Sequence, residues 1–436
     1  MRFFKIKFWA LSIVILSFQI LSSQDNIPLS LNSAVQLALQ KNTDIVIANY
    51  QANVSRFLLK EAKGNFLPKV YLNARYNRNI DRQVLFFSEA STTTKLGSDN
   101  DYSSSLNLTL PVYSNYNFVN KKVAEAKLDL QNEIARGVKQ TIINSTKKSY
   151  FNYLIALEVV KVQQSQLKNA QEILLDIKKR VKKGTLTEYD LTSAKVQVAN
   201  AKNSLLEAQS NSIPAENSLK SLLGLKTNDV LKLTESIQLM EKELFLGNQI
   251  EEMQEKNSKL KQLEIAVELN KKQVQLAKSS YYPILDAIGN YNFQTQSNNF
   301  DVFNYDWVNT SFVGMQLQFS IFNATITKNK VEQTKITQKI AEEEQEFTTR
   351  EYRMRFEELL LQLEFSKQKV EVQKENMNLT AEALTLTKKR YQFGIGTFLE
   401  VTNAELMYTQ SRLNWLKAIS DYKAAYYDYQ LLIGKE

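Results

Sequence analysis

The chain has 436 residues and a formal net charge of +9, and it contains neither cysteine nor histidine. The absence of these two residue types excludes disulfides and thiol chemistry, and it removes most metal sites, catalytic triads and proton shuttles. The lysines and arginines are spread along predicted helices, which favours solvated helix faces over nucleic-acid binding. No nucleophile–base pair, phosphate-binding loop or ligand cluster stands out, so we expect neither an enzyme nor a cofactor site.

Residues 1–24 have the pattern of a secretory signal peptide. Three cations precede an apolar run over 8–21, which at 14 residues is short for a membrane helix of about 20. The cations are Arg2, Lys5 and Lys7. Cleavage within 22–25 would lower the net charge from +9 to +6. No later uncharged run approaches this length, so we expect no helical membrane span in the rest of the chain.

The first structural repeat is predicted over 25–224, and it begins with a helix over 30–66. After Pro68, apolar and polar residues alternate, which predicts a strand over 70–82. A polar, irregular stretch over 83–101 is predicted as an exposed loop. A second alternating run predicts another strand, over 102–113.

Long helices are expected to follow. Residues 114–183 contain no proline and one glycine, which predicts a single helix on the order of 100 Å long. The later stretch over 323–393 contains neither residue, and its apolar residues form two edges, as expected for a helix that contacts neighbours on both sides in a ring of coiled coils. A short tip and a return helix over 188–223 complete the repeat, and Pro214 is expected to kink that helix.

The second repeat is predicted over 250–436, after an equatorial linker over 225–249. It has the same order of elements: a helix, two strands, a long helix, a tip and a return helix. The predicted strands lie over 284–296 and 307–322, the long helix over 323–393, and the return helix over 398–433.

Direct self-similarity supports the duplication. Residues 178–194 recur as 388–404, at an offset of 210 positions, while earlier pairs such as Lys41-Asn42 and Lys256-Asn257 are offset by 215. We place the loss of about five residues in the loop over 297–306, which is shorter than its counterpart over 83–101.

The predicted strands are of the kind that cross an outer membrane, because each is apolar on one face and polar on the other. A half-buried sheet of a soluble domain has the same pattern. Four strands cannot close a barrel, whereas three chains would supply twelve. The expected fold is therefore mainly α with a β-barrel part: a trimeric 12-stranded barrel continued by long coiled-coil helices that form a periplasmic α-barrel.

Two segments carry a resemblance to the TolC family of outer-membrane efflux proteins. Residues 390–404 read RYQFGIGTFLEVTNA and match the family's tip pattern R-Y-x-x-G-x-x-x-x-x-[DE]-V-x-x-A. Residues 108–113 read LTLPVY and are similar to the segment that closes the family's second strand. Each motif alone is weak, but both occur in order in a duplicated chain behind a signal peptide.

The resemblance implies a trimeric exit duct of a tripartite efflux or type I secretion system, which passes small molecules or proteins to the exterior. It implies an outer-membrane location in a Gram-negative bacterium, with an extension into the periplasm. The implied partners are two further copies of the chain, a periplasmic adaptor (membrane fusion) protein, an inner-membrane transporter and outer-membrane lipid.

The candidate site consists of the two tips, which are expected to gate the periplasmic entrance. Its residues are Gly184, Thr187, Asp190, Arg390, Tyr391, Gly394, Thr397, Glu400 and Asn403. The resemblance places Glu400 where family members carry an acid near the entrance, and Asn403 where some carry a second acid. Helix capping is the alternative: Thr397 and Glu400 have the spacing of a capping box, and Thr187 and Asp190 that of a weaker one. The two glycines are most simply left-handed helix caps.

A second function remains open from the sequence. The chain could be a periplasmic or secreted coiled-coil scaffold with a small sheet domain and no pore. The duplicated alternating strands argue against it, because a scaffold does not need them. Membrane fractionation distinguishes the two, since salt or carbonate releases a scaffold whereas a barrel requires detergent.

Overall fold

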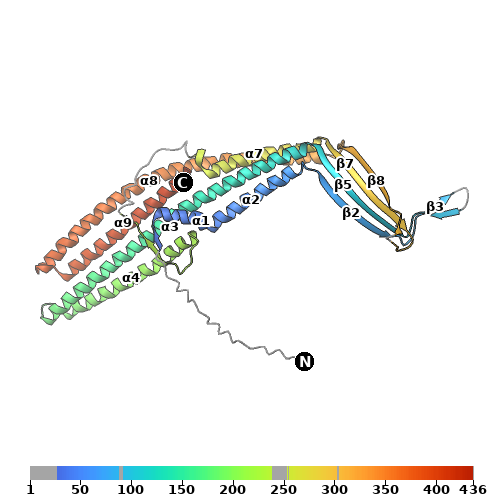
Figure 1. The fold of residues 1–436 in the computed structure, drawn as a ribbon. Coiled ribbons are helices and arrows are strands. Elements are labelled where there is room, and N and C mark those ends of the chain that lie inside the picture. Colours follow the sequence, from blue (N-terminus) through green and yellow to red (C-terminus); the bar gives the residue numbers. More distant parts are fainter. Residues whose placement is uncertain (1–26, 88–91, 238–252, 254, 302–303, 436) are drawn as a thin grey trace, which may run out of the picture.

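A computed structural model describes residues 27–87, 92–237, 253, 255–301 and 304–435. The molecule is elongated, with long helices along most of its length and one sheet at one end (Figure 1). The expected signal peptide lies outside the described residues, as does the part of the linker over 238–249. Within the described part of the chain, no helix is both long and apolar enough to cross a membrane.

The sheet is antiparallel and four-stranded, in the order β2-β5-β7-β8. Its strands are β2 (Lys69–Arg78), β5 (Asn100–Ser114), β7 (Ile284–Ser297) and β8 (Val308–Gln318). The expected ends at 82 and 322 were wrong. The β2 ladder ends where the Asn79 side chain turns to the carbonyl oxygen of Ser98, at 2.8 Å. The β8 ladder ends opposite Ile284, because Pro283 before it has no N–H to donate.

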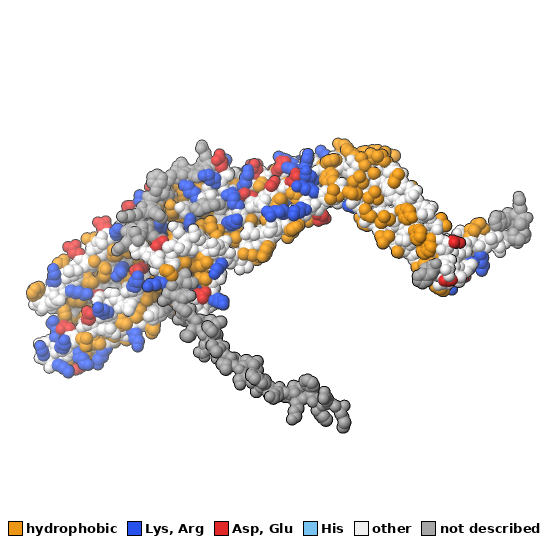
Figure 2. Space-filling model, viewed as in Figure 1, with side chains coloured by type: hydrophobic (Ala, Val, Ile, Leu, Met, Phe, Trp, Pro, Cys, Tyr) orange, Lys and Arg blue, Asp and Glu red, His pale blue; other side chains and the backbone are white. Residues whose placement is uncertain are grey.

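The strand register places most apolar residues of the four strands on one face, although Ile288 and Phe312 lie on the other. Val70 lies opposite Leu108 in the β2–β5 pair, and Leu285 lies opposite Leu317 in the β7–β8 pair. Directly opposed residues point to the same side of a sheet, so the predicted alternation adds up to one continuous apolar face. The other face is mainly polar, and there the Asn290 side-chain amide donates to Asn107 at 2.7 Å. Hydrophobic side chains cover the sheet in Figure 2.

The loop expected over 83–101 contains structure of its own. β3 (Val84–Phe87) and β4 (Thr92–Lys95) form an antiparallel hairpin beyond the end of the sheet (Figure 1). β3 reads VLFF and β4 reads TTTK, and valine, phenylalanine and threonine all favour the extended backbone of a strand. The expectation of an irregular loop was therefore wrong here.

The helix expected over 30–66 is in fact two helices, α1 (Leu31–Lys41) and α2 (Thr43–Gly64). Asn42 separates them, because its side-chain oxygen accepts hydrogen bonds from the backbone N–H groups of Asp44 and Ile45, at 2.9 and 3.4 Å. This side chain caps a new helix and so interrupts the old one. Just before α1, β1 (Ile27–Leu29) pairs in parallel with β6 (Leu231–Leu233), which belongs to the expected linker.

The remaining helices comprise two hairpins, α3–α4 and α8–α9, and a further helix, α7, that packs against α3 and α8. They are α3 (Asn115–Lys182), α4 (Glu188–Leu222), α7 (Ser258–Lys278) with the 3-10 turn η1 (Ser279–Tyr281), α8 (Ile326–Gln392) and α9 (Phe398–Leu432). α8 begins later than the expected residue 323, because Ala324 and Thr325 have positive φ angles of 51° and 68°. α4 continues through Pro214, and the kink there stays a prediction.

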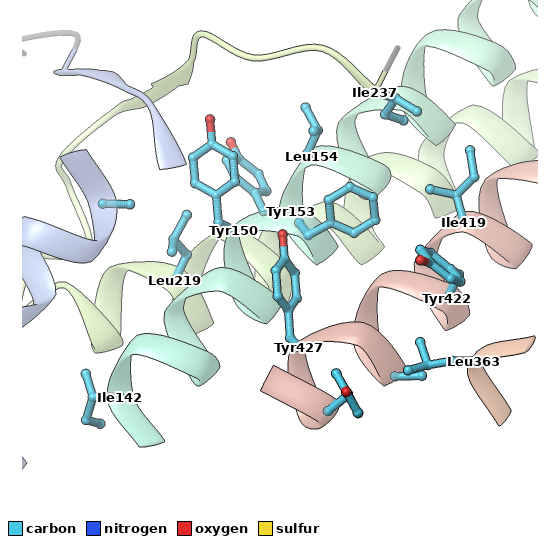
Figure 3. Packing of buried hydrophobic residues seen from close by; sticks show 14 of the residues in the cluster. Ile142, Tyr150, Tyr153, Leu154, Leu219, Ile237, Leu363, Ile419, Tyr422 and Tyr427 are labelled. Atoms are coloured by element: carbon cyan, nitrogen blue, oxygen red, sulfur yellow. The ribbon is translucent and has the colours of Figure 1, made fainter. Parts of the chain in front are cut away.

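The hydrophobic core lies midway along the helices, where both repeats meet (Figure 3). Tyr150 and Tyr153 of α3 are buried with Tyr422 and Tyr427 of α9. The Tyr150 hydroxyl donates to the carbonyl oxygen of Leu29 at 2.9 Å, so the ring also anchors β1. This core holds the two hairpins together at the ends remote from their tips. We call this level of the molecule the equator.

The repeated motifs Lys41-Asn42 and Lys256-Asn257 build the same junction twice at this level. The Asn42 side chain donates to the carbonyl oxygen of Leu222 at the end of α4, at 3.0 Å, and Asn257 donates to that of Leu432 at the end of α9, at 2.8 Å. Two residues after the end of each return helix stands a glycine with a positive φ angle, Gly224 or Gly434. A Cβ atom there would lie 2.8 Å from the Lys41 carbonyl oxygen or 2.4 Å from that of Lys256. Both junctions therefore require glycine.

Candidate functional site at the helical tips

The two helical tips lie at the end of the molecule remote from the sheet (Figure 1). Gly184 and Gly394 have φ angles of +73° and +77°, and no atom lies within 4 Å of where a Cβ would stand. The backbone N–H groups of Thr185 and Ile395 donate to the carbonyl oxygens of Arg180 and Arg390, each at 3.0 Å. The two turns thus share one backbone geometry, a left-handed helix cap, and the glycines serve it.

In the first tip, Thr187 and Asp190 form a complete capping box. The Thr187 hydroxyl accepts from the Asp190 N–H at 3.2 Å, and the Asp190 carboxylate accepts from the Thr187 N–H at 2.9 Å. The Thr187 hydroxyl also donates to that carboxylate at 2.7 Å. These hydrogen bonds from Thr187 lower the pKa of Asp190 below its ordinary value. The charge of Asp190 is therefore committed to the start of its own helix.

The second tip is capped only in part. The Thr397 hydroxyl accepts from the Glu400 N–H at 3.2 Å, but the Glu400 carboxylate lies 3.6 Å from the Arg390 guanidinium instead of bonding back to Thr397. The sequence analysis expected the stronger box here, so that expectation was wrong. Glutamate is one methylene longer than aspartate, and Arg390 at the end of α8 offers it a cation. The Glu400 side chain remains 44% exposed.

The Tyr391 side chain links the second hairpin to the first. Its hydroxyl donates to the Asp176 carboxylate at 3.2 Å, and its ring lies 4.7 Å from the Arg180 guanidinium. Arg180 in turn contacts Asp176 at 2.9 Å. Burial raises the pKa of Tyr391, and the charge of Arg180 opposes this. The sequence analysis named Tyr391 but missed both partners, although Asp176 and Arg180 stand one turn apart at the end of α3.

A second link lies farther from the tips. Glu405 of α9 is buried, with a side chain only 10% exposed, and Lys388 of α8 contacts it at 2.9 Å. The Asn169 side-chain amide of α3 donates to the same carboxylate. The sequence analysis missed Glu405, although it lies between Val401 and Thr409 on the buried stripe of α9. A charge on such a stripe requires a partner.

The structure thus brings some predicted site residues together and leaves others apart. Arg390 and Glu400 meet, as do Thr187 and Asp190, whereas Asn403 is exposed on α9. The links at Tyr391 and Glu405 are both polar: the first is partly exposed and worth little, and the second is buried. Within the described ranges, no group of three or more histidine, cysteine, aspartate or glutamate residues is placed to hold a metal ion.

Comparison with known proteins decides the family. The outer membrane efflux protein family matches residues 34–225 and 249–435, one segment for each repeat. The chain belongs to this family. The resemblance seen in the two sequence motifs is thereby confirmed. This efflux protein is accordingly an outer-membrane protein of a Gram-negative bacterium and extends into the periplasm.

Two curated relatives align with about half of the efflux protein. Toxin and drug export protein A of Aggregatibacter actinomycetemcomitans is 24% identical over 209 residues, and outer membrane protein TolC of Escherichia coli (strain K12) is 22% identical over 219 residues. Each alignment spans 43% of the relative's length. Their activities and partners therefore enter below only as proposals.

Solved channels share the whole fold. CusC superposes with a TM-score of 0.74 at 16% identity and covers 93% of this chain and 92% of its own. The Campylobacter jejuni CmeC outer membrane channel gives 0.76 at 17% identity, over 93% and 85% of the two chains. Vibrio cholerae VceC gives 0.75 at 16% identity, over 93% and 96%. The predicted fold, mainly α with long paired helices, a four-stranded antiparallel sheet and an internal duplication, is confirmed.

Proposed function

We propose that three copies of the efflux protein form one continuous exit duct through the outer membrane and into the periplasm. The observation that carries the proposal is the sheet. Within the described residues, its outer strands β2 and β8 each pair on one side only. An apolar sheet with open edges is not stable in lipid, because the unpaired backbone groups have no water to bond with. Pairing β8 of one copy with β2 of the next closes twelve strands from three chains.

The polar face of the sheet would line a water-filled lumen. That face carries amides such as Asn107 and Asn290, joined across β5 and β7, while the apolar face meets the lipid. The helical hairpins would continue the tube below the membrane. In this arrangement the hairpin tips mark the periplasmic entrance.

The tips would form the gate of this duct. The contacts of Tyr391 with Asp176 and Arg180, and the hydrogen bond from Asn169 to Glu405, hold the two hairpins of a chain together. Breaking them frees one hairpin to move away from the other, while the buried core at the equator stays intact. Glu400 would add negative charge at the entrance, because three-fold symmetry repeats it around one axis. Such a ring favours cations.

The partners of this chain are inferred from those of other members of its family. Channels of this family are trimers that act with periplasmic adaptors and inner-membrane transporters, and we extend both properties to this chain. The transported class is then small molecules or proteins, in an efflux or a type I secretion system. The scaffold alternative is disfavoured by the exposed apolar side chains of the sheet, such as Val313 at 89% and Met315 at 70% exposure, which only lipid or another apolar surface would cover.

Planar-bilayer recording of the purified protein tests the duct. We expect pores of low conductance from the wild-type chain, because the tips are linked, and larger conductance from Tyr391→Phe, which removes the hydroxyl that binds Asp176. The matched control is Tyr189→Phe, a change at an exposed tyrosine of α4. A detergent-stable protein that never forms pores, with or without the Tyr391 hydroxyl, would refute the duct.

A further inference from the structure

A band of cations borders the sheet at the adjoining ends of the helices. The nine residues nearest the sheet in each of α2, α3, α7 and α8 hold three, two, three and two cations, and together only two acids, Glu61 and Glu332. We call these ten cations the basic collar. They are Arg56, Lys60, Lys63, Lys121, Lys122, Lys271, Lys272, Lys278, Lys328 and Lys330.

Few of these charges are neutralised within the chain. Among the ion pairs of the described residues, Lys121 contacts Glu125 at 3.6 Å and Lys272 contacts Glu268 at 2.7 Å. Glu332 is bound to Lys335, which lies outside the collar. The other lysines of the collar form no ion pair among the described residues and are exposed, although Lys271 and Lys328 still lie within electrostatic range of Glu268 and Glu332. These other lysines are Lys60, Lys63, Lys122, Lys271, Lys278, Lys328 and Lys330.

The collar adjoins the apolar face of the sheet, as the blue side chains beside the orange surface show in Figure 2. Exposed aromatic residues occupy the boundary itself. Tyr281 and Tyr282 are 51% and 52% exposed after α7, and Phe322 is 83% exposed before α8. Amphipathic aromatic rings gather at the level of lipid headgroups. The Lys60 ammonium also lies 4.9 Å from the Phe57 ring, both on the exposed side of α2.

We propose that the basic collar binds the phosphate groups of anionic phospholipids in the periplasmic leaflet. The argument rests on the outer-membrane position of the sheet and on charge complementarity. The ten residues of β2, tilted as barrel strands are, span about 25 Å, which matches the hydrocarbon layer. The collar then lies at headgroup depth on the side of the helices. Flexible lysine stems reach along the apolar surface and place ammonium groups against phosphates.

The test measures lipid selectivity at the surface of the intact trimer in reconstituted membranes. Spin-labelled phosphatidylglycerol and phosphatidylcholine are compared by electron paramagnetic resonance of the motionally restricted lipid. We expect wild type to prefer phosphatidylglycerol by about fivefold or more, since one lysine close to a lipid phosphate has an effect of that order. The preference should weaken as salt is raised, because salt screens exposed charges.

The variant Lys60→Gln/Lys63→Gln/Lys271→Gln/Lys278→Gln should lower the preference to below about twofold. Its matched control removes four exposed lysines from parts of the helices away from the sheet: Lys195→Gln/Lys202→Gln/Lys389→Gln/Lys417→Gln. The control should keep the wild-type preference. Trimer mass and circular dichroism establish that both variants fold, and Lys122→Gln/Lys328→Gln/Lys330→Gln is a second collar variant if the first does not.

Three outcomes would overturn the proposal. Wild type could show no preference for phosphatidylglycerol, the folded collar variant could keep the full preference, or the control could lose as much as the collar variant. The last result would mean that overall charge, and not the collar, attracts the lipid. Each outcome leaves the duct itself intact, because pore formation is measured separately.

Discussion

The duplicated residues make the same contacts in both repeats at the equator, but they make different contacts at the two tips. At the equator, Asn42 and Asn257 make the same hydrogen bond, and Gly224 and Gly434 fill the same close approach. At the tips the backbone turns are also alike, but the acids differ. Asp190 is bound to its own helix, whereas Glu400 faces Arg390. The equator therefore serves stability in both repeats, while at the second tip the Glu400 carboxylate does not cap its own helix and stays partly exposed.

The largest effect is expected at the equator. Gly434→Ala would place a Cβ 2.4 Å from the Lys256 carbonyl oxygen, at a φ of +72°. Left-handed strain and overpacking together cost about 2–5 kcal/mol. Thermal unfolding of the detergent-solubilised protein should show a strongly lowered Tm. Gly394→Ala is the matched control, with the same backbone strain and open space, and should cost only about 1–2 kcal/mol. Equal losses would show that the junction is not tight.

A smaller effect is expected at the buried link between the hairpins. Glu405→Gln keeps the shape but removes the charge that accepts the hydrogen bond from Asn169 of α3 and that Lys388 of α8 contacts at 2.9 Å, which should cost about 1–3 kcal/mol. We expect a modest fall in Tm together with more frequent pore opening in planar bilayers. Glu382→Gln, at an exposed glutamate of α8, is the control. Unchanged opening would mean that Glu405 stabilises the hairpins without restraining them.

Loosening the tips alone should leave stability almost unchanged. Tyr391→Phe loses one partly exposed hydrogen bond, worth about 0.5–1.5 kcal/mol, while the ring can still lie against Arg180. Conductance should rise clearly while Tm stays almost unchanged, because the core between the hairpins is untouched. If Tm falls and conductance does not rise, the tyrosine is a packing residue and the gate lies elsewhere.

The smallest effects separate the two acids. The pKa of Asp190 is lowered in the folded chain, so its contribution to stability is present above its ordinary pKa of 3.8 and is lost as the pH falls through the lower folded value. Asp190→Asn should therefore remove a small acid-dependent part of Tm measured between pH 2 and 6 and leave ion selectivity alone. Glu400→Gln should instead weaken cation preference in planar bilayers and leave Tm nearly unchanged. The reverse pattern would make Glu400 a helix cap only.

The sequence predicts the regular parts of this molecule well, because they depend on local periodicity. Strand alternation gave the apolar face, and proline-free stretches gave α3 and α8. Contacts between hairpins could not be predicted, since Asp176 and Glu405 meet their partners only once the phase of each helix is known. The break at Asn42 had a signal, because an asparagine inside a helical pattern can cap a new helix. The β3–β4 hairpin was missed because the stretch over 83–101 as a whole is polar, although β3 itself reads Val-Leu-Phe-Phe.

The closure of the sheet is the central claim, and the association of the purified chain tests it most directly. The sequence has no cysteine, so one can be placed in β2 and one in β8, at Leu72 and Met315, without background. Mass measurement in detergent should give three chains, and oxidation of the double variant should yield covalent dimers and trimers. Single-cysteine variants should not give trimers. A stable monomer with full strand content, or crosslinks only within one chain, would contradict the shared barrel.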